Sequence, residues 1–178
     1  MVRKLISGLV VACLAVGLVG SALAGWDPAN EKQSLDTIAA FKKTDPGIDT
    51  FFKEAHAYAV FPEITKGAIG IGGAAGDGTV FEGGAAIGST SMSQVTIGLQ
   101  LGGQTYSEVI FFKDKAALDK FKGGDYEVAA GASAIALKDG VSKAAEYNNG
   151  VAIFTMGTGG LMFEASVGGQ KFKFTPKK

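Results

Sequence analysis

Cysteine, histidine and proline are scarce in this chain. Its 178 residues include one cysteine (Cys13), one histidine (His56) and four prolines. A disulfide needs two cysteines, and structural zinc sites take four Cys or His ligands. The sequence therefore argues against a disulfide framework and a structural zinc site, and we expect no metal. Collagen is excluded as well, because the glycines follow no three-residue period and proline is rare.

An excess of charge of either sign is also absent. Seventeen Lys and Arg residues balance seventeen Asp and Glu residues, and charged residues make up 19% of the chain against a usual share of about 25%. A neutral chain has no overall attraction for the phosphate backbone of nucleic acid. We therefore expect no nucleic-acid partner, and an anionic partner would have to be bound by a local group of lysines.

The first residues are typical of an export signal. Arg3 and Lys4 precede an apolar run over 5–20, and the small residues of Ala22–Ala24 fit a signal peptidase site. We predict a signal peptide over residues 1–24, with cleavage near the last of these alanines. The mature protein would then be periplasmic or secreted.

Two other interpretations of this segment stay open. Residues 10–13 have the form of a lipoprotein signal that would acylate Cys13, although the apolar run continues past Cys13, where lipoproteins usually become polar. The stretch 5–24 is also long enough to span a bilayer of about 30 Å. We expect the folded part to follow this segment, with a short helix in 25–44 and the main domain over 45–178.

Glycine and phenylalanine are abundant. Twelve of the 27 glycines lie between residues 67 and 103, and 47% of all residues are hydrophobic, including twelve phenylalanines. So apolar a composition excludes a disordered chain. After Tyr58 the apolar residues alternate, which predicts short strands separated by glycine turns. The predicted strands cover 59–61, 68–73, 79–81, 85–88, 95–101, 108–112, 127–137, 151–156, 161–167 and 171–174, with turns at 76–78, 83–84 and 102–103.

Three segments have helical spacing. Ser34–Lys43 is the first, residues 46–55 form a second behind an N-cap at Asp45, and residues 114–121 form a third capped by Asp114. The apolar stripe of the second helix should pack on the sheet. We predict an α+β fold dominated by antiparallel β structure, as a curled sheet, sandwich or partial barrel, with two N-terminal helices and one mid-chain helix.

One part of the chain resembles another. Residues 59–81 align without a gap on 152–174, with six identities. Both copies have an apolar start ending in Phe, a Thr-x-Gly triplet, a later glycine and a final Phe. We predict two related hairpins in equivalent places of the fold.

Nothing in the sequence assembles a catalytic site. His56 stands near the end of the second predicted helix, where the helix dipole favours a charged histidine without any further role. The glycines of 70–75 fit a dinucleotide-binding string, but another strand follows them instead of the helix that such a site needs. We therefore expect no enzyme activity and no cofactor.

Lysines beside aromatic residues suggest another kind of partner. Lys42 and Lys43 directly follow Phe41, and more lysines surround the third helix and the C-terminus. An anionic membrane surface attracts each such lysine by about 1 kcal/mol.

An ordered series of motifs resembles the SYLF domain. The series covers about 45–174 and begins with AYAVFPEITKG at 57–67. It continues through GIGG at 70–73, GDG at 76–78, GLQLGGQTYS at 98–107, IFF at 110–112, YEVAAGAS at 126–133, GGLM at 159–162 and GGQKF at 168–172. SYLF domains are lipid-binding modules, and eukaryotic members bind phosphoinositide membranes and actin.

The resemblance implies a non-catalytic lipid-binding protein of the bacterial envelope, with anionic phospholipid or a membrane surface as its partner. Lys42, Lys43 and Lys66 would contact headgroups, and Phe41 would insert shallowly into the bilayer. Cytoplasmic actin is an improbable ligand for an exported chain without an SH3 or FYVE domain. The alternative is a periplasmic structural or protein-interaction module without a lipid ligand, whose protein partner the sequence does not identify.

Overall fold

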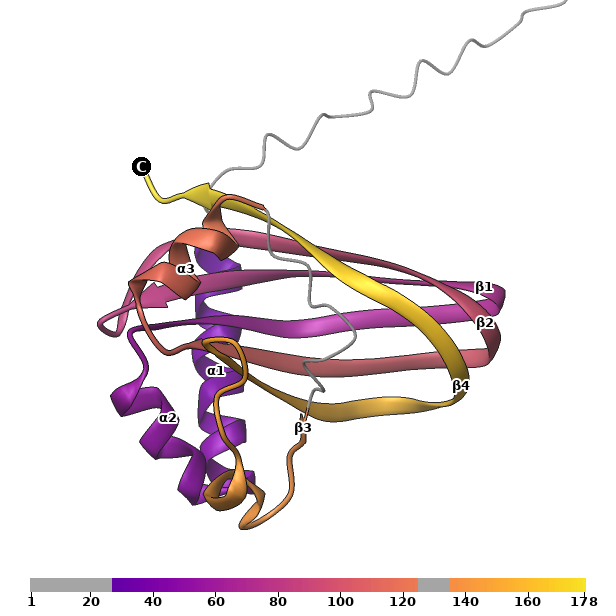
Figure 1. Cartoon of the computed structure of the whole chain (residues 1–178), viewed down its shortest axis with the longest axis horizontal. Coiled ribbons are helices and arrows are strands. Elements are labelled where there is room, and N and C mark those ends of the chain that lie inside the picture. Colours follow the sequence, from indigo (N-terminus) through magenta and orange to yellow (C-terminus); the bar gives the residue numbers. More distant parts are fainter. Residues whose placement is uncertain (1–26, 125–134) are drawn as a thin grey trace, which may run out of the picture.

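Three very long strands and a few helices make up the molecule (Figure 1). The computed structural model describes residues 27–124 and 135–178. The predicted signal peptide and most of the strand expected at 127–137 lie outside the described residues. The helices are α1 (Pro28–Thr44), the 3-10 helix η1 (Pro46–Ile48), α2 (Asp49–Glu54), α3 (Lys115–Lys122) and the 3-10 helix η2 (Val141–Ala144). The strands are β1 (Ala57–Glu82), β2 (Ala85–Phe112), β3 (Ile135–Ala136) and β4 (Val151–Pro176).

The strands form one sheet in the order β1-β2-β4-β3. The pairs β1–β2 and β2–β4 are antiparallel, and only the two-residue β3 runs parallel to β4. The predicted α+β class with a curled, mostly antiparallel sheet is therefore confirmed. The two predicted caps are confirmed, since Asp45 and Asp114 each accept a hydrogen bond from a backbone N–H, at 3.0 and 2.9 Å. Asp27, which was not predicted as a cap, accepts one at 2.9 Å. The first helix starts earlier than predicted, because Asp27 and Pro28 supply an N-cap and a first helical residue.

The predicted short strands are wrong in one respect. Only Gly83–Gly84 is a turn, with φ of +58° and +82°, while β1 continues through 76–78 and β2 through 102–103. A straight strand of 26 residues would be about 85 Å long. Figure 1 shows instead that β1, β2 and β4 each turn at one end of the molecule and run back. The glycines let the strands bend while their ladder of hydrogen bonds continues, so no separate turns are needed.

Two glycines mark the place where the folded sheet meets itself. A Cβ atom on Gly78 would lie 2.4 Å from the carbonyl oxygen of Val60, and one on Gly76 would lie 2.6 Å from that of Glu63. All four residues belong to β1, so the returning half of this strand packs directly on its outgoing half. The two halves of the sheet therefore form two layers, and no side chain fits between them at these points.

A bulge adjusts β1 to this arrangement. The register with β2 shifts between Phe61 and Ile64, and both of these side chains are fully buried in the same cluster. Pro62, which has no N–H for the ladder, lies in the bulge, and its carbonyl oxygen accepts a hydrogen bond of 2.6 Å from Ser107 Oγ.

Two apolar clusters stabilise the fold. The inner cluster lies between the two layers and is closed by α3 at the end opposite the bend, where Phe121 contacts Phe112 and Phe172 at ring distances of 4.8 and 5.0 Å. The outer cluster lies beneath α1 and α2 and contains Ile48 and Phe51, so the predicted packing of the second helix on the sheet is confirmed.

The two similar segments are single strands and not hairpins, which corrects that prediction. They are β1 and β4, which lie on opposite sides of β2 and are both antiparallel to it. The matching residues Ala59 and Ala152 pair with Ile110 and Phe111, one position apart. The similar sequences therefore occupy corresponding places beside the central strand.

Candidate functional sites

The predicted membrane-inserting residue is not on the surface. Phe41 is 0% exposed and belongs to the outer apolar cluster between α1 and the sheet. The expected shallow insertion of Phe41 is therefore corrected: the one bulky apolar side chain in the last turn of α1 is needed to attach that helix to the sheet.

The three predicted headgroup lysines lie on two different elements. Lys42, in the last turn of α1, makes an ion pair of 2.7 Å with Asp49 and lies 5.0 Å above the ring of Phe52. Lys43 is exposed beside it, whereas Lys66 is half-buried in β1, opposite Gln104 of β2. Part of the charge of Lys42 is thus used within the protein, and the lysines do not form one group with Phe41.

His56 has a structural position. Its Nε2 lies 2.9 Å from Glu82 Oε1 without an aligned hydrogen bond, and its backbone N–H donates to the carbonyl of Phe112 at 3.0 Å. His56 precedes β1 and Glu82 ends it, so this contact joins the two ends of the folded strand. No group of three or more His, Cys, Asp or Glu side chains within 27–124 and 135–178 could hold a metal ion.

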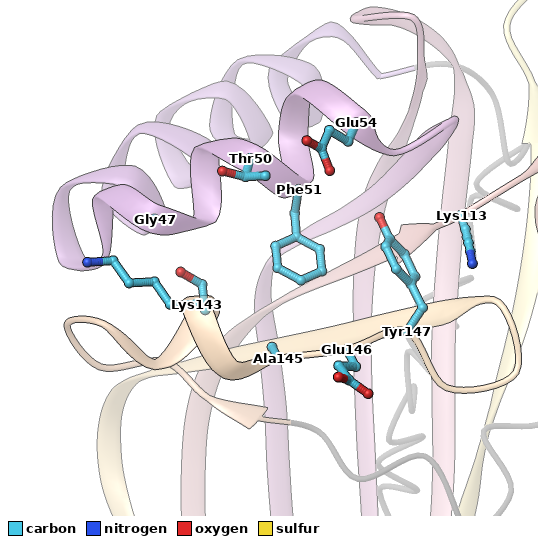
Figure 2. A pocket seen from close by; sticks show the side chains of 10 residues that line it. Gly47, Thr50, Phe51, Glu54, Lys113, Lys143, Ala145, Glu146 and Tyr147 are labelled. Carbon is cyan, nitrogen blue, oxygen red and sulfur yellow. The ribbon is translucent and has the colours of Figure 1, made fainter.

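A cavity of about 660 Å³ lies between α2 and the segment 142–147 (Figure 2). Its apolar wall is formed by Phe51 and Tyr147, whose rings are 5.4 Å apart. The charged residues that line it are Glu54, Glu146, Lys113 and Lys143. Two carboxylates and two amines give no preference for either sign of charge. A cavity of this size suits a small amphipathic molecule.

One buried carboxylate holds the walls of this cavity together. Asp45 accepts hydrogen bonds from the N–H groups of Gly47 at 3.0 Å and Ser142 at 2.8 Å, which connects η1 to η2. Burial raises the pKa of Asp45, but hydrogen bonds from Ser142, Gly47 and Gly140 outweigh it and leave the pKa below its usual value. A Cβ on Gly47 would lie 2.6 Å from Ser142 Oγ, so the contact requires glycine.

Tyr147 presents its ring to the cavity more than its hydroxyl. Burial, with a smaller effect of the Glu54 carboxylate, raises the pKa of Tyr147 to about 12, so the hydroxyl stays protonated. Its oxygen has almost no solvent exposure and no hydrogen-bond partner among the residues that the structure describes. Tyr147 therefore contributes apolar contact and no ionised group to this cavity.

The layer that contains the returning half of β1 has an outer face that differs from the cavity. Val95 of β2 is 68% exposed because its ladder neighbours on both sides, Gly73 of β1 and Gly169 of β4, have no side chains. Lys171 and Lys173 follow on the same exposed face of β4. A hollow of about 270 Å³ beside Val95 is lined by this valine together with Ser93, Gly169 and Lys171. An exposed apolar side chain with two nearby lysines can contact both the apolar and the anionic part of a partner.

A comparison with known proteins finds a partial similarity. The chain is 36% identical over 72 residues to a protein described as Beta cell expansion factor A from Aeromonas veronii. The match covers 40% of this chain and 28% of that protein. No protein-family model matches the chain. None of the helices in 27–124 and 135–178 is long and apolar enough to cross a membrane.

Sequence reasoning missed both the cavity and the Val95 face. The cavity residues come from three distant segments, and no local pattern connects them. The Val95 face had a signal, because Ser93 and Val95 alternate along one strand and Lys171 and Lys173 along another. Only the pairing of β2 with β4 brings them together.

Proposed function

We propose that the protein is a non-catalytic lipid-binding protein of the bacterial envelope, periplasmic or secreted, that binds anionic phospholipid. The observation that supports this most directly is the exposed Val95 between two glycines of the neighbouring strands, with Lys171 and Lys173 on the same face of β4. The resemblance to lipid-binding SYLF domains points the same way. The name of the Aeromonas veronii protein describes an effect on beta cells and does not name a ligand.

The physical reason lies in the combination of charge and exposed apolar surface. A lysine near an anionic membrane contributes about 1 kcal/mol, so Lys171 and Lys173 together would contribute about 2 kcal/mol. Burial of an exposed valine in the interfacial region adds at most about 1 to 2 kcal/mol. Lys43 and Lys66 stay candidates for further headgroup contacts, with Lys66 half-buried on the inner face of β1, whereas the fully buried Phe41 does not.

Vesicle co-sedimentation of the chain beginning at Gly25 tests the proposal. We expect binding at low salt to vesicles that contain phosphatidylglycerol and little binding to pure phosphatidylcholine. The double variant Lys171→Gln/Lys173→Gln should bind about 30-fold more weakly, and Val95→Ser several-fold more weakly. Leu35→Ser is the matched control, since Leu35 is the other exposed large apolar side chain among the described residues, at 50%, and lies on α1.

The outcomes distinguish the candidate surfaces. A loss of binding in Lys43→Gln/Lys66→Gln with no effect at Val95 would move the lipid contact to the residues predicted from sequence. Absence of binding to anionic vesicles at low salt would remove the lipid proposal altogether.

The edge of β4 favours one second candidate, a protein-interaction module. Within the described residues, β3 pairs with β4 only at Phe154 and Thr155. An uncovered strand edge can accept a strand from a partner protein. Crosslinking that captures a defined envelope protein through β4, together with no vesicle binding, would favour this function.

A further inference from the structure

Glu108 is a carboxyl group inside the folded sheet. It lies in the C-terminal half of β2, opposite Phe61 of β1 and Thr155 of β4, and it is 1% exposed. Tyr106 and Ile110, its neighbours on the same face of the strand, belong to the inner apolar cluster. The carboxyl group therefore faces the interior between the two layers.

One hydrogen bond connects Glu108 to the opposite layer. Gln170 Nε2 donates to Glu108 Oε2 at 3.2 Å. Gln170 lies in the returning half of β4, where it pairs with Gln94 of β2. Because Gln94 and Glu108 lie in the two halves of the same folded strand, this bond crosses from one layer to the other. The second carboxyl oxygen, Oε1, has no hydrogen-bond partner among the described residues.

This environment tolerates a neutral carboxyl far better than a charged one. Burial raises the pKa of Glu108 to about 7, and the bond from Gln170 lowers it only slightly. Among the side chains of β1 and β2 that the structure describes, the ionisable ones on the inner face are Tyr106 on β2 and, by the alternation of β1, Lys66. Neither is among the groups that shift the pKa of Glu108. The described part of β4 presents neutral groups to Glu108, and the buried residues of α3 are apolar. Within the part of the chain that the structure describes, no cation is therefore among the groups that shift the pKa of Glu108.

We propose that Glu108 and Gln170 form a proton-controlled latch between the two layers of the sheet. Protonated Glu108 holds the layers together, and loss of the proton loosens them and gives access to the inner apolar cluster. The direction follows from linkage between the proton and the opening. In the open form the carboxyl reaches water and its pKa returns to the ordinary, lower value. The closed form therefore binds the proton more tightly, so rising pH favours opening. The latch does not depend on the lipid-binding proposal.

Hydrogen exchange of the full chain at different pH values tests the latch. After correction for the intrinsic exchange rate, opening of peptides spanning 104–112 and 169–176 should increase about tenfold between about pH 6 and about pH 8. Glu108→Gln keeps the shape of the protonated group and cannot ionise, so its opening should not change over this range. Glu63→Gln is the control, because Glu63 is an exposed carboxylate on β1, and it should behave like the unmodified protein.

A second variant separates the latch from ordinary stabilisation. Gln170→Leu removes the bond between the layers and leaves the carboxyl in place, so opening should increase at every pH and still rise with pH. The latch is refuted if the unmodified protein and Glu108→Gln show the same dependence on pH. It is also refuted if Gln170→Leu leaves opening unchanged.

Discussion

An alanine at position 78 would place a methyl group 2.4 Å from the carbonyl oxygen of Val60. It would also lie 2.8 Å from Cδ1 of the Phe61 ring. The ring could rotate, but the carbonyl belongs to the backbone of β1, and Val60 and Gly78 are paired in the ladder with Val109 and Thr90. Relief of the clash therefore requires the two layers to separate by roughly an ångström, which disturbs the packing between them.

The size of the effect follows from this separation. Overpacking of a dense interior usually costs about 1 to 3 kcal/mol, and we expect Gly78→Ala to lower the free energy of unfolding by at least about 2 kcal/mol because the obstructing atom is main chain. Gly76→Ala should be nearly as damaging, since its Cβ would lie 2.6 Å from Glu63 O. Gly67→Ala is the matched control in the same strand. Its Cβ would have no atom within 4 Å, so we expect it to be neutral or to stabilise by about 0.5 kcal/mol.

Urea unfolding followed by far-UV circular dichroism measures these differences. We expect the urea concentration at half unfolding to be highest for Gly67→Ala, lower for Gly76→Ala and lowest for Gly78→Ala. The dependence of the unfolding free energy on urea should be similar in all three. Removal of the Phe61 ring should not rescue Gly78→Ala, because the Val60 carbonyl stays in place. Equal stability of the Gly67→Ala and Gly78→Ala proteins would show that the two halves of β1 do not approach as closely as described.

Two further changes test the helices. Phe41→Ala should lower the free energy of unfolding by about 3 to 5 kcal/mol, because Phe41 is 0% exposed in the outer cluster. Leu35→Ala, at a half-exposed site of the same helix, should cost well under 1 kcal/mol in the same denaturation assay. Asp114→Ala removes the side chain that accepts a hydrogen bond from Ala117 N–H at 2.9 Å. It should lower the melting temperature by a few degrees, which corresponds to about 1 kcal/mol. Asp114→Asn keeps an acceptor at this position and should retain most of the stability.

The helices could be predicted from the sequence because their signals are local. Each cap is an aspartate followed closely by the N–H that it accepts from, and two of the three caps are followed by proline. The inward face of α3 has an equally local signal, since Leu118 and Phe121 follow helical spacing and are both buried. Such contacts span only a few residues, so the sequence pattern contains them completely.

The candidate site was less predictable. Phe41 looks equally suited to a membrane and to a core, because burial depends on what packs against it and not on its own neighbours in sequence. Val95 looks like an ordinary alternating strand residue, and its exposure follows from glycines in two other strands. Sequence alone therefore gives lysines and aromatic residues as candidates, and only the pairing of strands selects among them.

The sequence by itself determined the caps at Asp45 and Asp114, the α+β class and the predominance of antiparallel strands, because capping, periodicity and composition are properties of short segments. The tertiary structure decided that the strands are continuous and fold back on themselves. It also decided that Gly76 and Gly78 face the backbone of Glu63 and Val60, at most 18 positions earlier in the same strand. The burial of Glu108 between the two layers was decided in the same way. These features arise where distant parts of the chain meet, and a glycine or a glutamate has the same local pattern whether it faces water or another layer.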